Sequence, residues 1–323
     1  MPTIIFFMGS CALPLVFMVA AAGLRAQFPV AQQPQEQATP TFQAGAALVR
    51  VDVQVLDGKR PVAGLTANDF VVREEGVERR PVSFGVESEP LQVVLLLDVS
   101  GSMGKMLRAM AAVGRQALAQ LKPQDQVAVF LFARETRLAA ELSSDLAVAE
   151  LALKDAPMEK GLGAGTSVND AILDVTNYFR RQPPFAGRRA VIVLTDNGGV
   201  HFKVPDEMVI HGLSDVHTVL NGIVPSEAKP PRELKGPGVN PDFTPANVFY
   251  LAAASGGEVL RSDDAGARFK ELLERIRLRY SLLLKPTPAP PDTFRRLEVE
   301  LSAEARRRYP KAEVHARSGY YAP

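Results

Sequence analysis

Two short, nearly continuous apolar runs constrain the fold of this chain more than any other feature. Residues 91–97 read LQVVLLL and residues 190–194 read AVIVL. Strands that are apolar on both sides are typical of a parallel sheet covered by helices on both faces. Apolar residues at helical spacing fill residues 105–121 and again residues 169–181. Strands that alternate with helices in this way predict a doubly wound α/β domain with a mostly parallel sheet.

The remaining segments of this region extend the same alternation. Asp145 precedes a helical pattern over residues 146–154 and is expected to cap it, because Asp is a favoured residue at that position. Residues 225–245 carry many Pro and Gly without periodicity and predict a long surface loop. The other predicted strands are residues 127–132, 136–142 and 216–224, and the other predicted helices are residues 248–254 and 265–279.

A smaller region of strand-like sequence flanks this domain on both sides. Residues 46–90 alternate apolar and polar side chains between turn signals, which indicates a short all-β unit. Two further alternating segments, around Leu297 and Val314, follow a Pro-rich connector and predict a C-terminal hairpin whose turn carries Arg306, Arg307 and Arg308. Residues 46–90 are short for an independent sandwich, so we expect the hairpin to complete this unit.

The N-terminus has the composition of an export signal. Residues 4–23 are apolar and uncharged, and a polar stretch rich in Gln and Pro follows them. Cleavage after Ala26 or within residues 20–22 would fit a secretory signal, whereas the same apolar run could be kept as a single membrane anchor. Cys11, the one cysteine, lies inside this segment. A cleaved chain would therefore contain no disulfide, and its place would be secreted, periplasmic or in the cell envelope.

These patterns together define the predicted fold class and domain organisation. The fold class is α/β, with a doubly wound, mostly parallel sheet and a smaller all-β unit built from N- and C-terminal segments. The predicted parts are a signal peptide at 1–26, a flexible spacer at 27–45, the N-terminal β segment at 46–90, the α/β domain at 91–283 and the hairpin at 284–323.

Composition excludes several classes of function. The chain of 323 residues has 37 Lys and Arg against 36 Asp and Glu, a net charge of +1. A dedicated nucleic-acid binder would show a clear basic excess, so we expect no nucleic acid among the partners. A hydrophobic content of 46% is too high for a mainly disordered chain. One cysteine cannot supply a Cys-rich zinc site.

Side chains that carry oxygen follow the two apolar runs. Asp98, Ser100 and Ser102 form the pattern D-x-S-x-S directly after the first run, and Asp196 follows the second. Thr166 lies in a Gly-rich loop before a predicted helix. Because the carboxyl ends of parallel strands meet at one edge of the sheet, these five side chains are expected to gather there. Hard cations prefer such oxygen ligands, so the sequence predicts a site for Mg²⁺, with Mn²⁺ or Ca²⁺ as alternatives.

The charge of this predicted site indicates what it could bind. Only Asp98 and Asp196 are carboxylates, and the three hydroxyls add no charge. A divalent cation held in this way stays electrophilic and has room for another anionic oxygen. An Asp or Glu carboxylate of a protein partner could supply that oxygen, and the glycines beside the serines leave the turn open to it.

At these residues the sequence resembles the von Willebrand factor type A (vWA) domain over about residues 91–280. The metal-ion-dependent adhesion site of that family combines D-x-S-x-S, a Thr in a middle loop and an Asp after the fourth strand. The resemblance implies that Ser100, Ser102 and Thr166 would contact the metal directly and that Asp98 and Asp196 would act largely through water. The family usually has Gly directly after that Asp, where this chain has Asn197.

A second resemblance covers most of the chain after the predicted signal. The chain is similar to exported proteins grouped as the VWFA-related Acidobacterial domain family at Gly64-Leu65-Thr66, Asn68-Asp69-Phe70, Glu75-Gly76 and the closing Arg317-Ser318-Gly319-Tyr320-Tyr321. The function of that family is poorly defined. This resemblance therefore implies that the chain is exported, but it implies no particular chemical activity.

The sequence favours a binding protein over an enzyme. The hydrolase pattern G-x-S-x-G and the phosphate-binding pattern G-x-x-x-x-G-K-[ST] are both absent. His201, His211, His217 and His315 lack metal-ligand spacing, and none stands in the context of a catalytic base. We therefore expect a metal-dependent protein-binding or adhesion module. The alternative is a structural or assembly factor of the cell envelope, in which the metal site is vestigial or purely stabilising.

Overall fold

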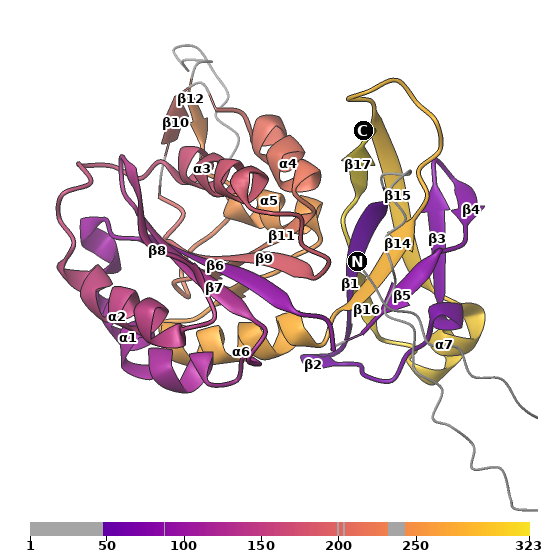
Figure 1. Cartoon of the computed structure of the whole chain (residues 1–323), viewed down its shortest axis with the longest axis horizontal. Coiled ribbons are helices and arrows are strands. Elements are labelled where there is room, and N and C mark those ends of the chain that lie inside the picture. The colour runs from indigo at the N-terminus through magenta and orange to yellow at the C-terminus, as the bar shows by residue number, and fades with distance from the viewer. Residues whose placement is uncertain (1–47, 87, 199, 203, 232–242) are drawn as a thin grey trace, which may run out of the picture. The chain divides into compact units, whose positions relative to one another are not determined.

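The two apolar runs form the centre of a six-stranded sheet in the computed structural model (Figure 1). The structure describes residues 48–323 apart from residues 87, 199, 203 and 232–242. The strand order is β13-β11-β9-β6-β7-β8, and all neighbours are parallel except β7 and β8. The strands are β6 (Leu91–Asp98), β7 (Gln126–Phe132), β8 (Thr136–Ser143), β9 (Arg188–Leu194), β11 (Thr218–Val224) and β13 (Val259–Arg261).

Helices cover both faces of this sheet, which explains why β6 is apolar throughout. Val93, Leu95 and Leu97 point into a core with the helices on one face, and Val94 and Leu96 point into a second core on the other. In Figure 1 the first face carries α1 (Gly104–Leu118), α2 (Leu146–Asp155) and α6 (Ala265–Arg277), and the second carries α3 (Val168–Arg181), α4 (Asp206–Asp215) and α5 (Val248–Ser255). Asp145 caps α2 as predicted, since its side chain accepts a hydrogen bond from the Ala147 amide.

Two antiparallel sheets pack on a third hydrophobic core. The first has the order β16-β1-β14-β5, with β2 paired to β1; the second has the order β17-β15-β3-β4. Strands from before and after the α/β region are neighbours in both, which confirms the predicted fold class. The strands are β1 (Val49–Asp57), β2 (Arg60–Pro61), β3 (Phe70–Glu74), β4 (Val77–Arg79), β5 (Ser83–Gly85), β14 (Tyr280–Leu284), β15 (Phe294–Leu301), β16 (Glu313–His315) and β17 (Gly319–Tyr321).

The predicted C-terminal hairpin is wrong. β15 pairs with β3 and β17, whereas β16 pairs with β1 in the other sheet. Between them lies the short helix α7 (Ala303–Arg308), whose cap residue Ser302 accepts a hydrogen bond from the Ala305 amide. Arg306, Arg307 and Arg308 therefore belong to a helix rather than a hairpin turn. A capping serine starts a helix at this point, and the helix carries the chain from one sheet to the other.

Other short elements refine the sequence predictions. The predicted loop over residues 225–245 ends in β12 (Phe243–Pro245), which pairs with β10 (Val200–Phe202). The predicted end of the α/β domain at residue 283 falls inside β14, a strand of the antiparallel sheet that contains β1. Single 3₁₀ turns are η1 (Ala67–Asp69), η2 (Gly101–Met103) and η3 (Ala156–Met158).

The predicted export segment, residues 4–23 with Cys11, and the spacer at 27–45 lie outside the described residues. Within the described part of the chain, no helix has the length and apolar character needed to cross a membrane.

Candidate metal centre

Asp98 is the last residue of β6, and its side chain is completely buried at the carboxyl edge of the parallel sheet. Its Oδ1 accepts a hydrogen bond from the Ser100 amide at 2.9 Å, and its Oδ2 accepts one from the Thr195 hydroxyl at 2.8 Å. Thr195 directly follows β9, the neighbour of β6 in the sheet. The orientation of the Asp98 carboxylate is therefore fixed by two separate segments of the chain.

The environment of Asp98 makes its negative charge costly. Burial raises the pKa of this carboxyl to about 6, although the hydrogen bonds from Ser100 and Thr195 lower it and the nearby charge of Asp196 raises it slightly. The Ser100 and Thr195 donors are both uncharged groups, so they stabilise the carboxylate without balancing its charge. A buried carboxylate in this situation gains from a nearby cation.

Ser100, Ser102 and Asp196 form a connected chain of oxygens at the same edge. The Ser100 and Ser102 hydroxyl oxygens are 3.3 Å apart, and the Ser102 hydroxyl donates a hydrogen bond to Asp196 Oδ2 at 2.6 Å. Asp196 Oδ1 accepts from the Gly198 amide at 2.9 Å. Ser102 is exposed and Asp196 is half-buried. This part of the site is therefore open to solvent, in contrast to Asp98.

Thr166 reaches the same edge through its loop. The amide of the following residue, Ser167, donates to the Ala133 carbonyl at 2.8 Å, just after β7. The Val99 amide, just after β6, donates to the Phe132 carbonyl at 2.8 Å. Because β6 and β7 are adjacent, these two bonds place the half-buried Thr166 beside the turn that carries the two serines.

The five predicted site residues thus occupy one edge of the sheet. Hydrogen bonds among themselves or through Thr195 connect Asp98, Ser100, Ser102 and Asp196, and the loop after β7 places Thr166. Two carboxylates and three hydroxyls are a donor set that suits a hard cation such as Mg²⁺. No group of three or more His, Cys, Asp or Glu that could hold a metal ion occurs in the described residues, and this site itself has only two carboxylates. The assignment of the five residues as metal ligands stays a prediction.

Thr195, which the sequence did not indicate as part of the site, and Asn197, noted above as a departure from the vWA family, both shape this site. Thr195 holds Asp98, and the only signal for it was its place between the apolar run and Asp196. Asn197 has φ of 61°, in the left-handed region where Gly and Asn are the favoured residues. Its side-chain oxygen accepts a hydrogen bond from the Val248 amide at 2.9 Å, at the start of α5. Asn197 can therefore stand where the vWA family usually has Gly, and it also ties the loop to a helix.

Comparison with known proteins agrees with this geometry. Residues 93–199 match the family model for the von Willebrand factor type A domain. This part of the chain is therefore a vWA domain, a module typically used for protein binding or adhesion. The match contains all five predicted metal ligands and all of β6 except its first two residues. No curated protein matches the chain.

The chain also matches solved structures from several bacteria. An aerotolerance-related membrane protein from Bacteroides fragilis is 20% identical, with 58% of this chain and 98% of that chain covered and a TM-score of 0.45. A von Willebrand factor type A protein from Catenulispora acidiphila is 14% identical, with 81% and 72% covered and a TM-score of 0.45. The family assignment rests on the match to the family model.

Proposed function

We propose that this chain is an exported, non-enzymatic binding protein. Its vWA domain would hold Mg²⁺, or alternatively Mn²⁺ or Ca²⁺, and present the ion to an Asp or Glu side chain of a protein partner. The observation that carries this proposal is the connected set of oxygens in which Ser100 lies beside Ser102 and Ser102 donates to Asp196.

The arrangement of charge supports an incoming carboxylate as the final ligand. The five candidate ligands would offer a divalent cation two negative charges, and Asp98 is buried while Ser102 is exposed. The buried side of the site would hold the ion, and the exposed side would leave it open to one more oxygen. An anionic oxygen on that side would gain more from the cation than a neutral one would.

The partner of such a site would be another protein rather than nucleic acid. A net charge of +1 gives no general attraction to a phosphate backbone. The apolar segment at residues 4–23 supports export, with a membrane link only if that segment is kept as an anchor.

Isothermal titration of the full chain with Mg²⁺ tests the metal step. We expect one binding event, weakened by about tenfold or more in Asp98→Ala and in Ser100→Ala, a loss typical of damaged metal sites. Ser88→Ala lies at an exposed turn just before β6, at the opposite end of that strand from Asp98. It is the matched control and should bind normally. Equal metal affinity in all four proteins would contradict the metal site.

Capture of a partner from envelope extract, with and without EDTA, tests the binding step. We expect a partner that is retained in Mg²⁺ and released by EDTA, and that Ser100→Ala fails to retain. If Mg²⁺ binds but partner capture is unaffected by EDTA and by Ser100→Ala, the ion has only a stabilising role. The alternative of a structural or assembly factor of the cell envelope would then be correct.

A further inference from the structure

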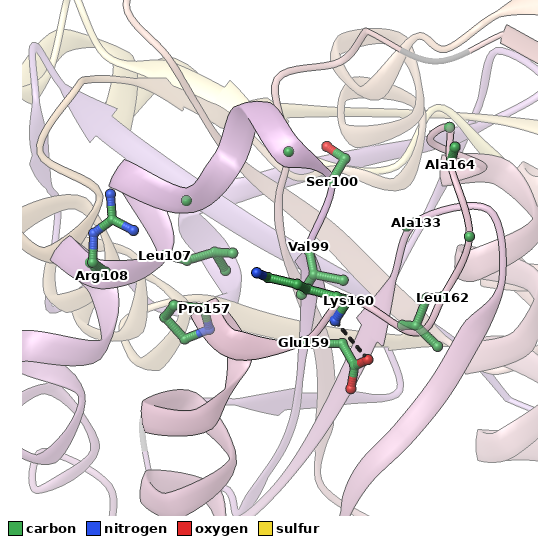
Figure 2. A pocket seen from close by; sticks show the side chains of 14 residues that line it. Val99, Ser100, Leu107, Arg108, Ala133, Pro157, Glu159, Lys160, Leu162 and Ala164 are labelled. Atoms are coloured by element: carbon green, nitrogen blue, oxygen red, sulfur yellow. Dashed lines mark hydrogen bonds between the residues drawn. The ribbon is translucent and has the colours of Figure 1, made fainter.

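A cavity of about 520 Å³ opens directly beside the candidate metal centre (Figure 2). Ser100 and Gly101 of the turn after β6 form part of its wall, and Gly163 and Gly165 of the Thr166 loop form another part. Its volume falls within the range of roughly 300–1,000 Å³ that is common for ligand sites. The cavity and the candidate metal centre therefore share Ser100.

Two cationic side chains line this cavity. Arg108, on α1, extends back over the helix start, with its Nη1 3.4 Å from the position that a Cβ on Gly104 would take. Lys160 points across the cavity toward Leu107 in Figure 2. Both are exposed, and neither forms an ion pair with another described residue. They are positive charges available to a ligand.

The one carboxylate among the lining residues, Glu159, already has its own partners. Its oxygens accept hydrogen bonds from the amides of Gly161 at 2.6 Å and Lys160 at 2.9 Å, and it forms an ion pair with Arg137. The bond from the Gly161 amide and the charge of Arg137 hold the pKa of Glu159 below its usual value. Its charge is therefore balanced from outside the cavity, which leaves the positive charges of Arg108 and Lys160 in excess.

We propose that this cavity is an anion subsite that takes a second carboxylate from the same acidic segment of the partner. The inference rests on the proposed function, because the first carboxylate of that segment would occupy the metal. Arg108 can bind a carboxylate with two parallel hydrogen bonds, and Lys160 adds a mobile point charge. Val99, Leu107 and Leu162 supply an apolar wall for the methylene groups of an Asp or Glu side chain. The partner segment would thus carry two acidic residues close together.

Two labelled peptides of equal length test this subsite by fluorescence anisotropy with the full chain in Mg²⁺. One peptide carries a single Asp among Gly and Ser, and the other carries a second Asp at spacings of one to four residues. At low salt we expect the best two-Asp peptide to bind about tenfold more tightly, the combined effect of two partly exposed charge pairs. The double variant Arg108→Gln/Lys160→Gln should lose this preference and keep the affinity for the single-Asp peptide.

The matched control is Arg181→Gln/Lys270→Gln, which removes two exposed positive charges from α3 and α6. It should keep the full preference for the two-Asp peptide, because that preference depends on Arg108 and Lys160 and not on the overall positive charge of the chain. The subsite would be overturned if the unsubstituted chain does not prefer the two-Asp peptide. It would also be overturned if the Arg108/Lys160 variant keeps that preference.

Failure of the proposed function gives a different result. In that case EDTA leaves the binding of the single-Asp peptide unchanged. This result does not depend on how tightly the two-Asp peptide binds. The subsite then stands only if the two-Asp preference persists in EDTA and still disappears in the Arg108/Lys160 variant. Absence of binding by every peptide would overturn the subsite, and the Mg²⁺ titration would report on the metal centre separately.

Discussion

The two ends of β6 and β9 carry polar clusters of opposite character. At the end where these strands begin, Arg188 lies beside Leu91 and is 1% exposed. At the end where they finish lie Asp98 and Asp196. The first cluster is a set of charges that pair with one another, and the second is a set of oxygens with few positive charges of their own. The same sheet thus carries a cluster of paired charges at one end. At its other end it carries the candidate metal centre, which we call the open site.

The cluster at the beginning of the strands joins the two types of sheet. Arg188 donates hydrogen bonds to Asp52 on β1 at 3.2 Å and to Glu89 at 3.2 Å, and Ser281 on β14 lies between these two carboxylates. Further bonds from Arg188 reach the carbonyls of Ile276, Arg277 and Arg279 at the end of α6. We call Arg50, Asp52, Glu89, Arg188 and Ser281 the ionic joint.

The two ends differ in charge balance, and this difference indicates which of them is the candidate binding site. In the ionic joint every charge has an opposite charge within the molecule, so the cluster holds elements together and offers nothing to a ligand. At the finishing end the carboxylates have neutral partners, so a cation would complete the cluster. Because the two clusters share no residues, substitutions in one should leave the other unaffected.

The largest expected effect is the loss of Arg188. Arg188→Met removes one of the positive charges that balance the carboxylates of Asp52 and Glu89 in a buried environment. Such a change typically costs about 3–5 kcal/mol of unfolding free energy. Urea denaturation measures it, and Arg181→Met on the exposed side of α3 is the matched control, expected to change stability by less than about 0.5 kcal/mol. A loss below about 1 kcal/mol in Arg188→Met would contradict the role of the ionic joint.

Mg²⁺ is expected to stabilise the chain through the other end of the strands. At a concentration one hundred times the dissociation constant, a ligand that binds only the folded state adds about 2.7 kcal/mol. Thermal unfolding with Mg²⁺ and with EDTA measures this gain, which should persist in Arg188→Met and disappear in Ser100→Ala. If the gain disappears in Arg188→Met as well, the two clusters are coupled and the comparison is wrong.

Acid should weaken the ionic joint through Asp52. Burial alone would raise the pKa of this carboxyl, but Arg50, Arg188 and the Ser281 hydroxyl together hold it below its usual 3.8. The unfolded chain therefore takes up this proton at a higher pH than the folded chain. The stability from Asp52 is complete well above pH 3.8 and is lost as the pH falls through the lower, folded-state pKa.

Asp52→Asn provides the measurement for that prediction. At pH 7 it should cost about 2 kcal/mol, the contribution typical of hydrogen bonds to a charged group. Unfolding free energies over a pH series should show the gap between the two proteins narrowing below pH 3.8. A gap that stays constant down to the acid transition would mean that Asp52 is not paired in the folded state.

The sequence predicted the clustering of Asp98, Ser102 and Asp196 better than it predicted the ionic joint, and the reason is physical. Apolar runs and D-x-S-x-S are local patterns, and the rule that parallel strands end at one edge converts them into spatial proximity. Arg50 and Asp52 alternate with valines in β1, a pattern that a solvent-facing strand would also show. Their partner Arg188 is 136 residues from Asp52, and no local pattern connects them.

The same limit explains the errors in the β region. A hairpin between the segments around Leu297 and Val314 is the simplest expectation for two neighbouring alternating segments. The structure instead inserts α7 between them, and the two strands pair with strands more than 200 residues earlier in the chain. In the same way, the hydrogen bond from Thr195 to Asp98 depends on the adjacency of β6 and β9, which the sequence implied but did not specify.

The smallest expected effect is the difference in stability between two variants of Asn197. It tests whether the backbone conformation of this residue positions the side chains of the open site. Asn197→Gly keeps access to the left-handed conformation and loses only the bond to the Val248 amide. Asn197→Ala loses that bond and must also adopt a conformation that costs a non-glycine residue roughly 1–2 kcal/mol. Denaturation should therefore show the Ala variant to be less stable than the Gly variant by about 1 kcal/mol.

Metal titration of the same two variants extends the prediction from stability to the site. Asn197 directly follows Asp196, so strain at Asn197 would move the Asp196 carboxylate away from Ser102. The Gly variant, which restores the residue usual in the vWA family, should bind Mg²⁺ like the unsubstituted chain, and the Ala variant should bind it more weakly. If both variants bind equally and are equally stable, backbone conformation at residue 197 does not position Asp196. The geometry of the open site would then depend on Thr195 and the Ser102 hydrogen bond instead.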